Sequence, residues 1–278
     1  MRCDVALLAH VLLDGVEERE LDLRLSERER AALSTVARPD VRRRRAAGRL
    51  AAKHLLLRDG AESAAGTPAD GDRFVALDGA GLQAFPADRY REVELIPADG
   101  GGAPLPTLRG EALASRLSIA HAGAVSCAAL SSRGNALGVD LETVEPRTGA
   151  FYRGNFTAGE RAWVGAAAAT GALDAEWLYT FLWTVKEAAL KSGAAPVRSV
   201  WEFLAVEVDG PPDLAARLAG CIGAELGERF TAFDVTVTAA GRSTRGAVET
   251  TATRDAILTL FTVSTAFTAA TAALEATP

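Results

Sequence analysis

The feature that most constrains the fold is a pair of charged segments, one with strand periodicity and one with helical periodicity. Residues 137–142 read LGVDLE, so an extended strand would place Asp140 and Glu142 on the same face. Further along the chain, Glu187 and Lys191 are four residues apart, the spacing that puts two side chains on one helical face. Three carboxylates that can converge, with a lysine one turn beyond the third, suit a hard divalent cation that holds phosphate oxygens.

Composition favours a compact globular chain. The 278 residues are 49% hydrophobic and 24% charged, values that fit one large domain or two modest ones. No apolar run approaches ~18 residues free of charge, so no membrane span is expected. The apolar segment Val5–Leu13 carries His10 and ends without a small-residue cleavage site, which favours a strand over a signal peptide. Three scattered cysteines (Cys3, Cys127 and Cys221) lack pairing or metal-ligand spacing, which indicates buried or free thiols in a reducing cytosol.

Charge is unevenly distributed along the chain. The net charge of −6 argues against a general nucleic-acid binder. Between Arg42 and Arg58, however, six Arg, one Lys and one His occur without any acidic residue. A solvated helix face, an anion site and a docking strip for an acidic partner all explain this basic block, and the sequence leaves the three open.

Local patterns in the first part of the chain predict strands and helices in mixture. Ser26 and Glu29 have capping-box spacing, so a helix is expected to begin there. A second, longer helix is expected from about Asp40 to Arg58. The predicted strands span residues 3–13, 74–77, 92–96, 117–120 and 124–130.

The second part of the chain repeats this style without a detectable sequence repeat. Thr157 and Glu160 form a second capping-box pattern before an Ala-rich helix that runs to about residue 169. Asp174 is expected to cap the next helix, which Gly193 and Pro196 end. The other elements expected are strands at 136–141, 201–208, 230–238 and 257–265 and a helix after 211–213. We therefore expect an α+β protein with two αβ halves, residues 1–134 and 135–278.

Each polar candidate also has a structural explanation. Asp140 and Glu142 suit hydrated acids on an edge strand, although their apolar neighbours favour a half-buried strand whose acids need water or a cation. Glu187 and Lys191 suit a surface ion pair that stabilises the helix by only about 0.2–0.5 kcal/mol. Capping explains Glu160 without catalysis, and His121 suits a structural histidine at a strand end. The four tryptophans are most simply explained as core residues.

Taken together, five segments carry a resemblance to one family. They are Arg44-Arg-Ala-Ala-Gly-Arg49, Ser118-Ile-Ala-His121, Gly138-Val-Asp-Leu-Glu142, Phe156-Thr-Ala-Gly-Glu160 and Trp183-Thr-Val-Lys-Glu-Ala-Ala-Leu-Lys191. In order and spacing they resemble the 4′-phosphopantetheinyl transferases of the surfactin-synthetase-activating (Sfp) type. The match is specific over residues 118–193 and loose over residues 26–58. The resemblance implies the fold of that family, with two similar αβ halves related by pseudo-twofold symmetry, the second half carrying the metal and signature motifs.

The resemblance also implies a reaction. Enzymes of this type move the phosphopantetheine arm of coenzyme A onto a serine of an apo carrier protein and release 3′,5′-ADP. Asp140, Glu142 and Glu187 would hold Mg²⁺, with Mn²⁺ as an alternative ion, against the pyrophosphate. Lys191 would offset the charge that grows on the leaving oxygen. Glu160 would take the serine proton directly or through a water, with Glu187 as the alternative base.

Five further residues are implied as coenzyme A contacts: Arg28, Arg44, Arg49, His121 and Lys186. A guanidinium can bind phosphate bidentately, which suits the 3′-phosphate end of the nucleotide. Two departures from the family pattern weaken this set. Ala120 stands where a serine is usual, and Gly102-Ala-Pro104 stands where Gly-Lys-Pro is common. Both would weaken coenzyme A binding more than turnover.

The partners implied are apo acyl or peptidyl carrier proteins, which would dock through an acidic helix, and coenzyme A. No nucleic acid or membrane partner is expected, and the chain is expected to be a cytoplasmic monomer. No residue distinguishes carriers of fatty acid, polyketide or nonribosomal peptide synthesis. Two rival hypotheses remain: a non-catalytic homologue that still binds carrier proteins, and a phosphate- or nucleic-acid-binding module that uses the basic block.

Overall fold

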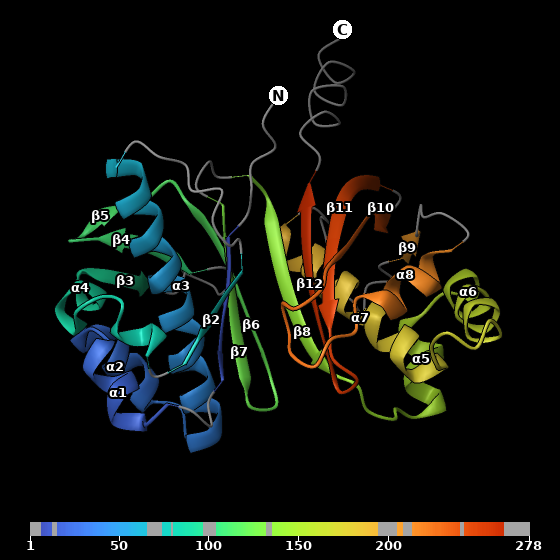
Figure 1. The fold of residues 1–278 in the computed structure, drawn as a ribbon, viewed down its shortest axis with the longest axis horizontal. Helices are drawn as coiled ribbons and strands as arrows, with labels where there is room; N and C mark the ends of the chain where they lie inside the picture. The colour runs from blue at the N-terminus through green and yellow to red at the C-terminus, as the bar shows by residue number, and fades with distance from the viewer. Residues whose placement is uncertain are drawn as a thin grey trace, which may run out of the picture. The chain divides into compact units, whose positions relative to one another are not determined.

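The computed structural model describes residues 7–12, 16–65, 74–78, 80–96, 104–131, 135–193, 205–207, 213–239 and 242–263. The chain divides into two compact units, Met1–Gly134 (unit 1) and Asn135–Pro278 (unit 2). Each unit combines helices with β-sheet and has a hydrophobic core of its own (Figure 1). The predicted mixed α+β class is therefore confirmed.

The described residues of unit 1 form two sheets and a long helix. Its helices are α1 (Glu18–Arg24), α2 (Glu27–Ser34), α3 (Pro39–Ala65), the 3₁₀ helix η2 (Gly81–Gln83) and α4 (Ala87–Glu92). Its strands are β1 (Leu7–Leu12), β2 (Phe74–Leu77), β3 (Val93–Ile96), β4 (Leu105–Leu108), β5 (Glu111–Ala112), β6 (Arg116–Ala122) and β7 (Val125–Ser131). The larger sheet has the order β2-β1-β7-β6, in which β1 runs parallel to β2 and antiparallel to β7. The smaller sheet has the order β3-β4-β5.

Helix α3 packs along the larger sheet of unit 1, against β1, β6 and β7. Its apolar side chains, among them Ala47, Leu50 and Leu55, are fully buried there. Gly48 permits the close approach to β6, because a Cβ atom at this position would lie 2.6 Å from Cγ2 of Ile119. The helix therefore buries a stripe of small and branched apolar residues, as helical periodicity requires.

The basic block within α3 does not form one solvated face. Lys53 is fully buried and His54 is nearly so, with its Nδ1 atom 2.9 Å from the hydroxyl oxygen of Tyr90. Arg44 is half-buried, whereas Arg45 is exposed. The cations of the block therefore have different environments, and their contacts have to be considered one by one.

Unit 2 contains one five-stranded antiparallel sheet. Its strands are β8 (Leu137–Thr143), β9 (Ala205–Glu207), β10 (Thr231–Ala239), β11 (Arg242–Ala252) and β12 (Ala256–Val263). Its helices are α5 (Gly149–Asn155), α6 (Ala158–Ala168), α7 (Ala175–Ser192) and α8 (Leu214–Gly220). The strand order is β8-β12-β11-β10-β9. Strand β8, which carries the two predicted acids, is therefore an edge strand of this sheet.

Helix α7 lies against β8 and β12 (Figure 1). Asp174 caps its first turn, accepting a hydrogen bond from the backbone N–H of Trp177 at 2.8 Å. Its last turn ends at Gly193, whose φ of 74° is the left-handed conformation that glycine adopts without a steric cost. A Cβ atom at Gly138 in β8 would lie 1.9 Å from the carbonyl oxygen of Ala188. Contact between β8 and α7 therefore requires glycine at that position.

Most predicted elements are present within the described residues. Both capping boxes form as predicted, and the three strands predicted near residues 117–141 are β6, β7 and β8. Strand β11 was not predicted, because its Arg, Thr and Gly residues lack the expected apolar alternation. Gly246 in this strand lies under Phe261, whose ring a Cβ atom would meet at 2.3 Å.

Several predictions lie outside the described residues. These concern Cys3, Gly102, Ala103, Pro196 and Trp201, and the ends of the first strand and of the strand predicted at 201–208. In the part of the chain that the structure describes, no helix has both the length and the apolar character needed to span a bilayer.

Candidate active site on β8 and α7

The contact between β8 and α7 brings the predicted acids of unit 2 together. Asp140 is buried, and its Oδ1 accepts a hydrogen bond from the ammonium of Lys191 at 2.6 Å. Glu142 Oε1 accepts a hydrogen bond from the indole N–H of Trp183 at 3.1 Å. Glu187 is half-buried on α7, and its charge raises the pKa of both Asp140 and Glu142. The three carboxylates and the lysine thus form one electrostatic group.

Asp140 is the most perturbed member of this group. Burial raises the pKa of its carboxyl to about 7, although the ammonium of Lys191 opposes the shift. The neighbouring charges of Glu142 and Glu187 raise this pKa further. Its second oxygen, Oδ2, is buried and has no hydrogen-bond partner among the described residues. A buried carboxylate oxygen without a partner is costly, so this atom is suited to an additional cation or donor.

Glu142 is half-buried, whereas Asp140 is buried. Burial raises the pKa of its carboxyl, and the guanidinium of Arg147 opposes this shift from 3.4 Å. Arg147 also pairs with Glu145 at 2.9 Å. Arg147 was not predicted as a residue of this site, because an arginine in a connecting segment carries no local signal for a contact with the preceding strand.

The fit of this group to a divalent cation rests on its donor set. Among the residues that the structure describes, no group of three or more His, Cys, Asp or Glu side chains is already arranged as a metal site. Two observations still favour cation binding: the unpartnered Oδ2 of Asp140, and the mutual repulsion of three carboxylates. Carboxylate oxygens are the ligands that Mg²⁺ prefers. The chemical type of these side chains therefore fits the predicted Mg²⁺.

Glu160 is buried within structural contacts. It completes the capping box of α6, since the backbone N–H of Thr157 donates to its Oε2 at 2.7 Å. The same oxygen accepts from the ammonium of Lys186 at 2.8 Å, and Oε1 accepts from the backbone N–H of Val206 at 2.7 Å. Both oxygens of Glu160 are thus engaged, and its side chain is 3% exposed.

Lys186 is equally enclosed. Its side chain is 1% exposed, and its ammonium also donates to the carbonyl oxygen of Asn155 at 2.7 Å. The ammonium lies 4.9 Å from the centre of the Phe156 ring, a cation–π distance. Burial lowers the pKa of Lys186, and the charge of Glu160 opposes that shift.

Aromatic side chains surround the outer end of this site. Trp183 packs between Phe151 and Phe156, and Tyr152 stacks on Tyr179 at 4.3 Å between ring centres. Trp183 is therefore partly core, as predicted, and also a hydrogen-bond donor to an acid of the site. This second role depends on a contact between residues far apart in the sequence.

The predicted coenzyme A contacts of unit 1 have varied environments. Arg28 is 69% exposed and pairs with Glu94 at 3.3 Å, and Arg44 pairs with Asp40 at 2.9 Å. The buried Nε atom of Arg49 has no hydrogen-bond partner within the described part of the chain, and burial lowers the pKa of its guanidinium. His121 is exposed at the end of β6.

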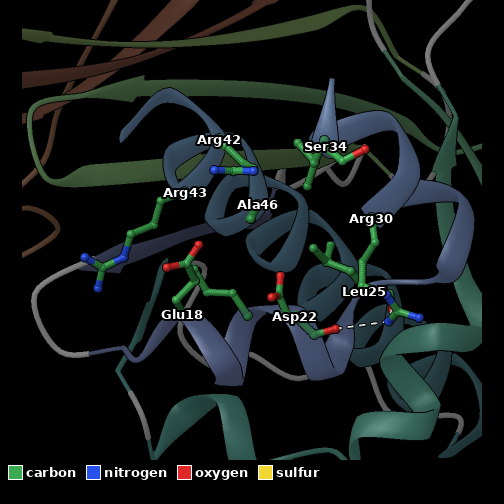
Figure 2. Close-up of a pocket in the computed structure, with 10 residues that line it drawn as sticks. Glu18, Asp22, Leu25, Arg30, Ser34, Arg42, Arg43 and Ala46 are labelled. Atoms are coloured by element: carbon green, nitrogen blue, oxygen red, sulfur yellow. Dashed lines mark hydrogen bonds between the residues drawn. The ribbon is translucent and has the colours of Figure 1, made fainter. Parts of the chain in front are cut away.

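A pocket of about 160 Å³ opens in unit 1 beside α1, α2 and α3 (Figure 2). Arg30, Arg42 and Arg43 line it together with the acids Glu18 and Asp22. Because charges of both signs face this pocket, it does not have the uniform positive character that an anion site requires. This pocket therefore does not indicate which ligand, if any, the basic block binds.

Comparisons with known proteins bear on unit 2. No curated protein matches the chain. Residues 136–268 contain β8, the helices α5 to α8 and every acid of the site on β8 and α7. This segment, residues 136–268, matches the family model of the 4′-phosphopantetheinyl transferase superfamily, which supports a role in phosphopantetheinyl transfer in general terms.

Proposed function

We propose that the protein is a Mg²⁺-dependent 4′-phosphopantetheinyl transferase of the Sfp type that acts in the cytoplasm on apo acyl or peptidyl carrier proteins. The observation that carries this proposal is the unpartnered Oδ2 of Asp140, buried within a group of three carboxylates and one lysine. In a cluster of acidic residues on the protein surface, such an oxygen would be hydrated. A buried one is suited to a cation that enters with a phosphate substrate.

Asp140, Glu142 and Glu187 would hold the metal in this proposal. When bound, Mg²⁺ would neutralise negative charge on the pyrophosphate of coenzyme A. The hydrogen bond from Trp183 keeps Glu142 oriented, as outer contacts orient metal ligands in other sites. Lys191 is 32% exposed and would face the oxygen that leaves.

The bond changes follow from the substrates. The serine oxygen of the carrier forms a bond to the phosphorus that bears the pantetheine, and the bond from that phosphorus to the bridging oxygen breaks. The electron pair leaves with 3′,5′-ADP, where the ammonium of Lys191 offsets the charge. The serine proton passes to a base. We assign this base to Glu187, because both oxygens of Glu160 accept structural hydrogen bonds.

For the nucleotide end of coenzyme A we propose Arg28, Arg44, Arg49 and His121 as contacts. Arg44 pairs with the exposed Asp40, and exposed ion pairs contribute only about 0–1 kcal/mol. Exchange of this partner for a phosphate therefore costs little.

The rival hypothesis of an inactive carrier-binding homologue depends on Ala120. Ala120 is 2% exposed on β6, whereas the next residue, His121, is exposed. Alternation along a strand places these side chains on opposite faces. The missing hydroxyl therefore lies on the buried face, which favours retained coenzyme A binding over its loss.

The test is incubation with coenzyme A, Mg²⁺ and a set of apo carrier proteins, followed by intact-mass measurement of each carrier. Wild-type protein is expected to add one phosphopantetheine arm, and chelation of Mg²⁺ to stop the reaction. Glu187→Gln and Asp140→Asn are each expected to lower the rate by about 100-fold or more, because each removes the negative charge of a proposed metal-binding carboxylate.

Two matched substitutions control for general effects. Glu176→Gln makes the same change on the exposed face of α7, and Asp234→Asn removes an exposed carboxylate of β10. Both variants should retain the wild-type rate within about twofold, since surface changes away from the site cost little. The proposal fails if no carrier gains the arm while an active transferase modifies the same samples. Full activity in either site variant would remove the metal assignment.

A further inference from the structure

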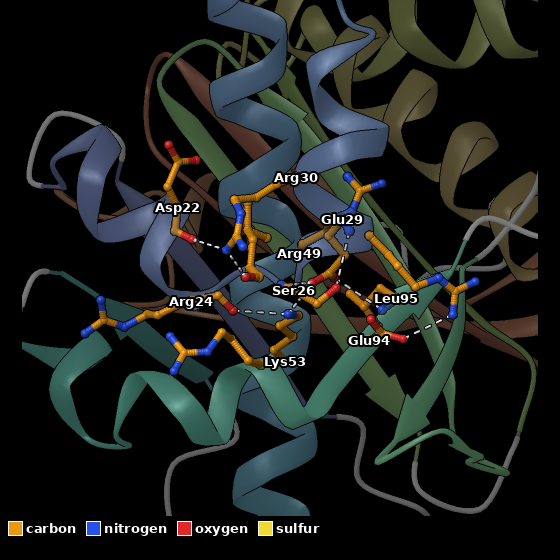
Figure 3. Close-up of polar contacts among 12 residues, drawn as sticks. Asp22, Arg24, Ser26, Glu29, Arg30, Arg49, Lys53, Glu94 and Leu95 are labelled. Atoms are coloured by element: carbon orange, nitrogen blue, oxygen red, sulfur yellow. Dashed lines mark hydrogen bonds and ion pairs between the residues drawn. The ribbon is translucent and has the colours of Figure 1, made fainter.

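The same set of buried polar contacts occurs once in each unit. In unit 1 the set, which we call the Glu29 cluster, is centred on the capping-box acid of α2 (Figure 3). Glu29 Oε2 accepts from the backbone N–H of Ser26 at 2.9 Å and from the ammonium of Lys53. Its Oε1 accepts from the backbone N–H of Leu95 at 3.2 Å, and Lys53 also donates to the carbonyl oxygen of Arg24 at 3.2 Å.

In unit 2 the corresponding set, the Glu160 cluster, repeats these contacts atom for atom. Oε2 of the capping acid accepts from the N-cap backbone and from the buried lysine, and Oε1 accepts from a strand N–H. The lysine donates to the last residue of the preceding short helix, Arg24 in α1 and Asn155 in α5. In both clusters that residue is two positions before the N-cap.

The elements around the two clusters also correspond. A short helix, a capped helix and a long helix follow one another as α1-α2-α3 in unit 1 and α5-α6-α7 in unit 2. In unit 1 the long helix α3 packs on the antiparallel strands β1, β7 and β6. In unit 2 the long helix α7 packs on the antiparallel strands β8 and β12, and β12 pairs with β11. The strand that donates to Oε1 is β3 in unit 1 and β9 in unit 2. The two units thus share an order of three helices and the same buried cluster, although their sheets differ.

A buried ion pair of this kind is not explained by stability alone. Desolvation of two charges offsets most of their attraction, so replacement of such a pair by apolar residues is often neutral. The pair does fix the orientation of α7. The ammonium of Lys186 on this helix donates to the end of α5 and to Glu160 at the start of α6, and Glu160 in turn accepts from β9. Successive helical residues differ by roughly 100° of rotation, so the direction of Lys186 sets the directions of Glu187 and Lys191.

We infer that Lys186 and Glu160 are positioning residues, which orient Glu187 and Lys191 toward β8, and that Lys53 and Glu29 are their structural duplicate in unit 1. This inference rests on the proposed function for its kinetic consequence. It replaces the direct coenzyme A contact expected of Lys186 and the proton transfer expected of Glu160. Lys53 provides a matched control for kcat, because it has the same contacts but is not followed on its helix by an acid of the site on β8 and α7.

The kinetic test compares Lys186→Met, Glu160→Gln and the double variant. Lys186→Met is expected to lower kcat by at least about tenfold, because it misplaces the acids, with KM for coenzyme A within about twofold. The double variant removes the buried unpaired charge but does not restore the contacts of the ammonium, so we expect its kcat to lie between those of Lys186→Met and the wild type. Lys53→Met should lower the thermal midpoint as Lys186→Met does, but keep kcat within about twofold.

Three results would overturn the inference. The first is a rise in KM for coenzyme A as large as the fall in kcat, which indicates a phosphate contact. The second is a double variant no better than Lys186→Met, which indicates a chemical role for the ammonium. The third is an equal fall in kcat for Lys53→Met, which indicates a general loss of structure. If Lys186→Met does not fold, the double variant carries the first comparison, and the second is made between the double variant and Glu160→Gln, whose higher kcat would indicate a chemical role for the ammonium.

A stability measurement separates this inference from the proposed function. In urea unfolding, each single variant of a cluster is expected to have a lower midpoint than the double variant of the same cluster, for Glu160 with Lys186 and for Glu29 with Lys53. The comparison needs no enzymatic activity. Additive losses in either cycle would show that the two clusters are not equivalent coupled pairs, whether or not the wild-type protein transfers the arm.

Discussion

At the scale of single residues, a buried polar atom without a hydrogen-bond partner destabilises the fold, whereas a buried atom with a partner does not. Every oxygen of the Glu160 carboxylate has a donor, whereas Oδ2 of Asp140 and Nδ1 of His10 are buried with no partner in the described structure. A buried unpaired polar atom costs about 1–3 kcal/mol. Asp140 is therefore suited to a ligand, while His10 belongs to the interior of unit 1, 4.9 Å from the Phe74 ring.

Burial of His10 predicts a loss of stability in acid. Burial lowers its pKa from 6.5 to about 4, so between these values the unfolded chain binds a proton that the folded chain does not. The free energy of unfolding should therefore fall as the pH drops below about 6.5, and the loss should level off near pH 4. Asp140 acts in the opposite direction over part of this range, because its pKa is raised.

The comparison of wild type with His10→Leu isolates the histidine. Urea unfolding at several pH values between 7.5 and 4 should show that the difference in free energy changes with pH, by on the order of 2 kcal/mol. A difference that stays constant across this range would contradict the assignment. Circular dichroism at pH 7.5 serves as the control that the variant is folded.

At the scale of elements, the distance between β8 and α7 determines how the acids meet. The helix and strand approach so closely at Gly138 that a methyl group would overlap the backbone of α7 at Ala188 and lie 2.6 Å from the backbone nitrogen of Ser192. Backbone atoms cannot move aside as a side chain does. The glycine thus determines the geometry of the candidate site, although it contributes no functional group.

Two glycine substitutions test this contact. Gly138→Ala should destabilise the protein by about 3 kcal/mol or more, because it forces β8 from α7. Gly48→Ala should cost less than Gly138→Ala, because it meets the Cγ2 methyl of Ile119 rather than backbone atoms and gains about 1 kcal/mol of helix propensity. Urea unfolding measures both. Equal or reversed costs would contradict the close approach, and loss of soluble protein for Gly138→Ala alone agrees with it.

At the scale of the whole molecule, the buried apolar residues form two clusters, one wholly within each unit. Leu50 is fully buried in the cluster of unit 1, and Leu178 in that of unit 2. Each unit thus has the contacts that a cooperative folding unit needs.

Hydrogen exchange should detect these two cores separately. Leu50→Ala is expected to cost about 2–5 kcal/mol and to reduce amide protection in α3 and its sheet, with protection in α7 and β12 retained. Leu178→Ala should have the reverse effect. Mass spectrometry of peptides after exchange would measure both, and an equal loss of protection in the two units for either variant would contradict the prediction.

The sequence by itself determined the local features of this protein. Capping boxes at Ser26 and Thr157, the cap at Asp174 and the end of α7 at Gly193 all form as predicted, because each depends on residues within one or two helical turns. The alternation in β8 likewise determined that its acids share a face. Strand β11 was missed because its burial depends on neighbouring strands rather than on its own pattern.

Only the tertiary structure decided which atoms of those residues have partners. Glu160 and Lys186 are 26 residues apart in the sequence, and Lys191 and Asp140 are 51 apart, so no local pattern shows their contacts. Lys53 reads as one cation of a basic block, yet packing buries it against Glu29. Hydrogen bonds and burial depend on distances in space between segments that the chain brings together only on folding. For that reason the sequence predicted which residue types meet at the candidate site, whereas the contacts that engage both oxygens of Glu160 could not be predicted from it.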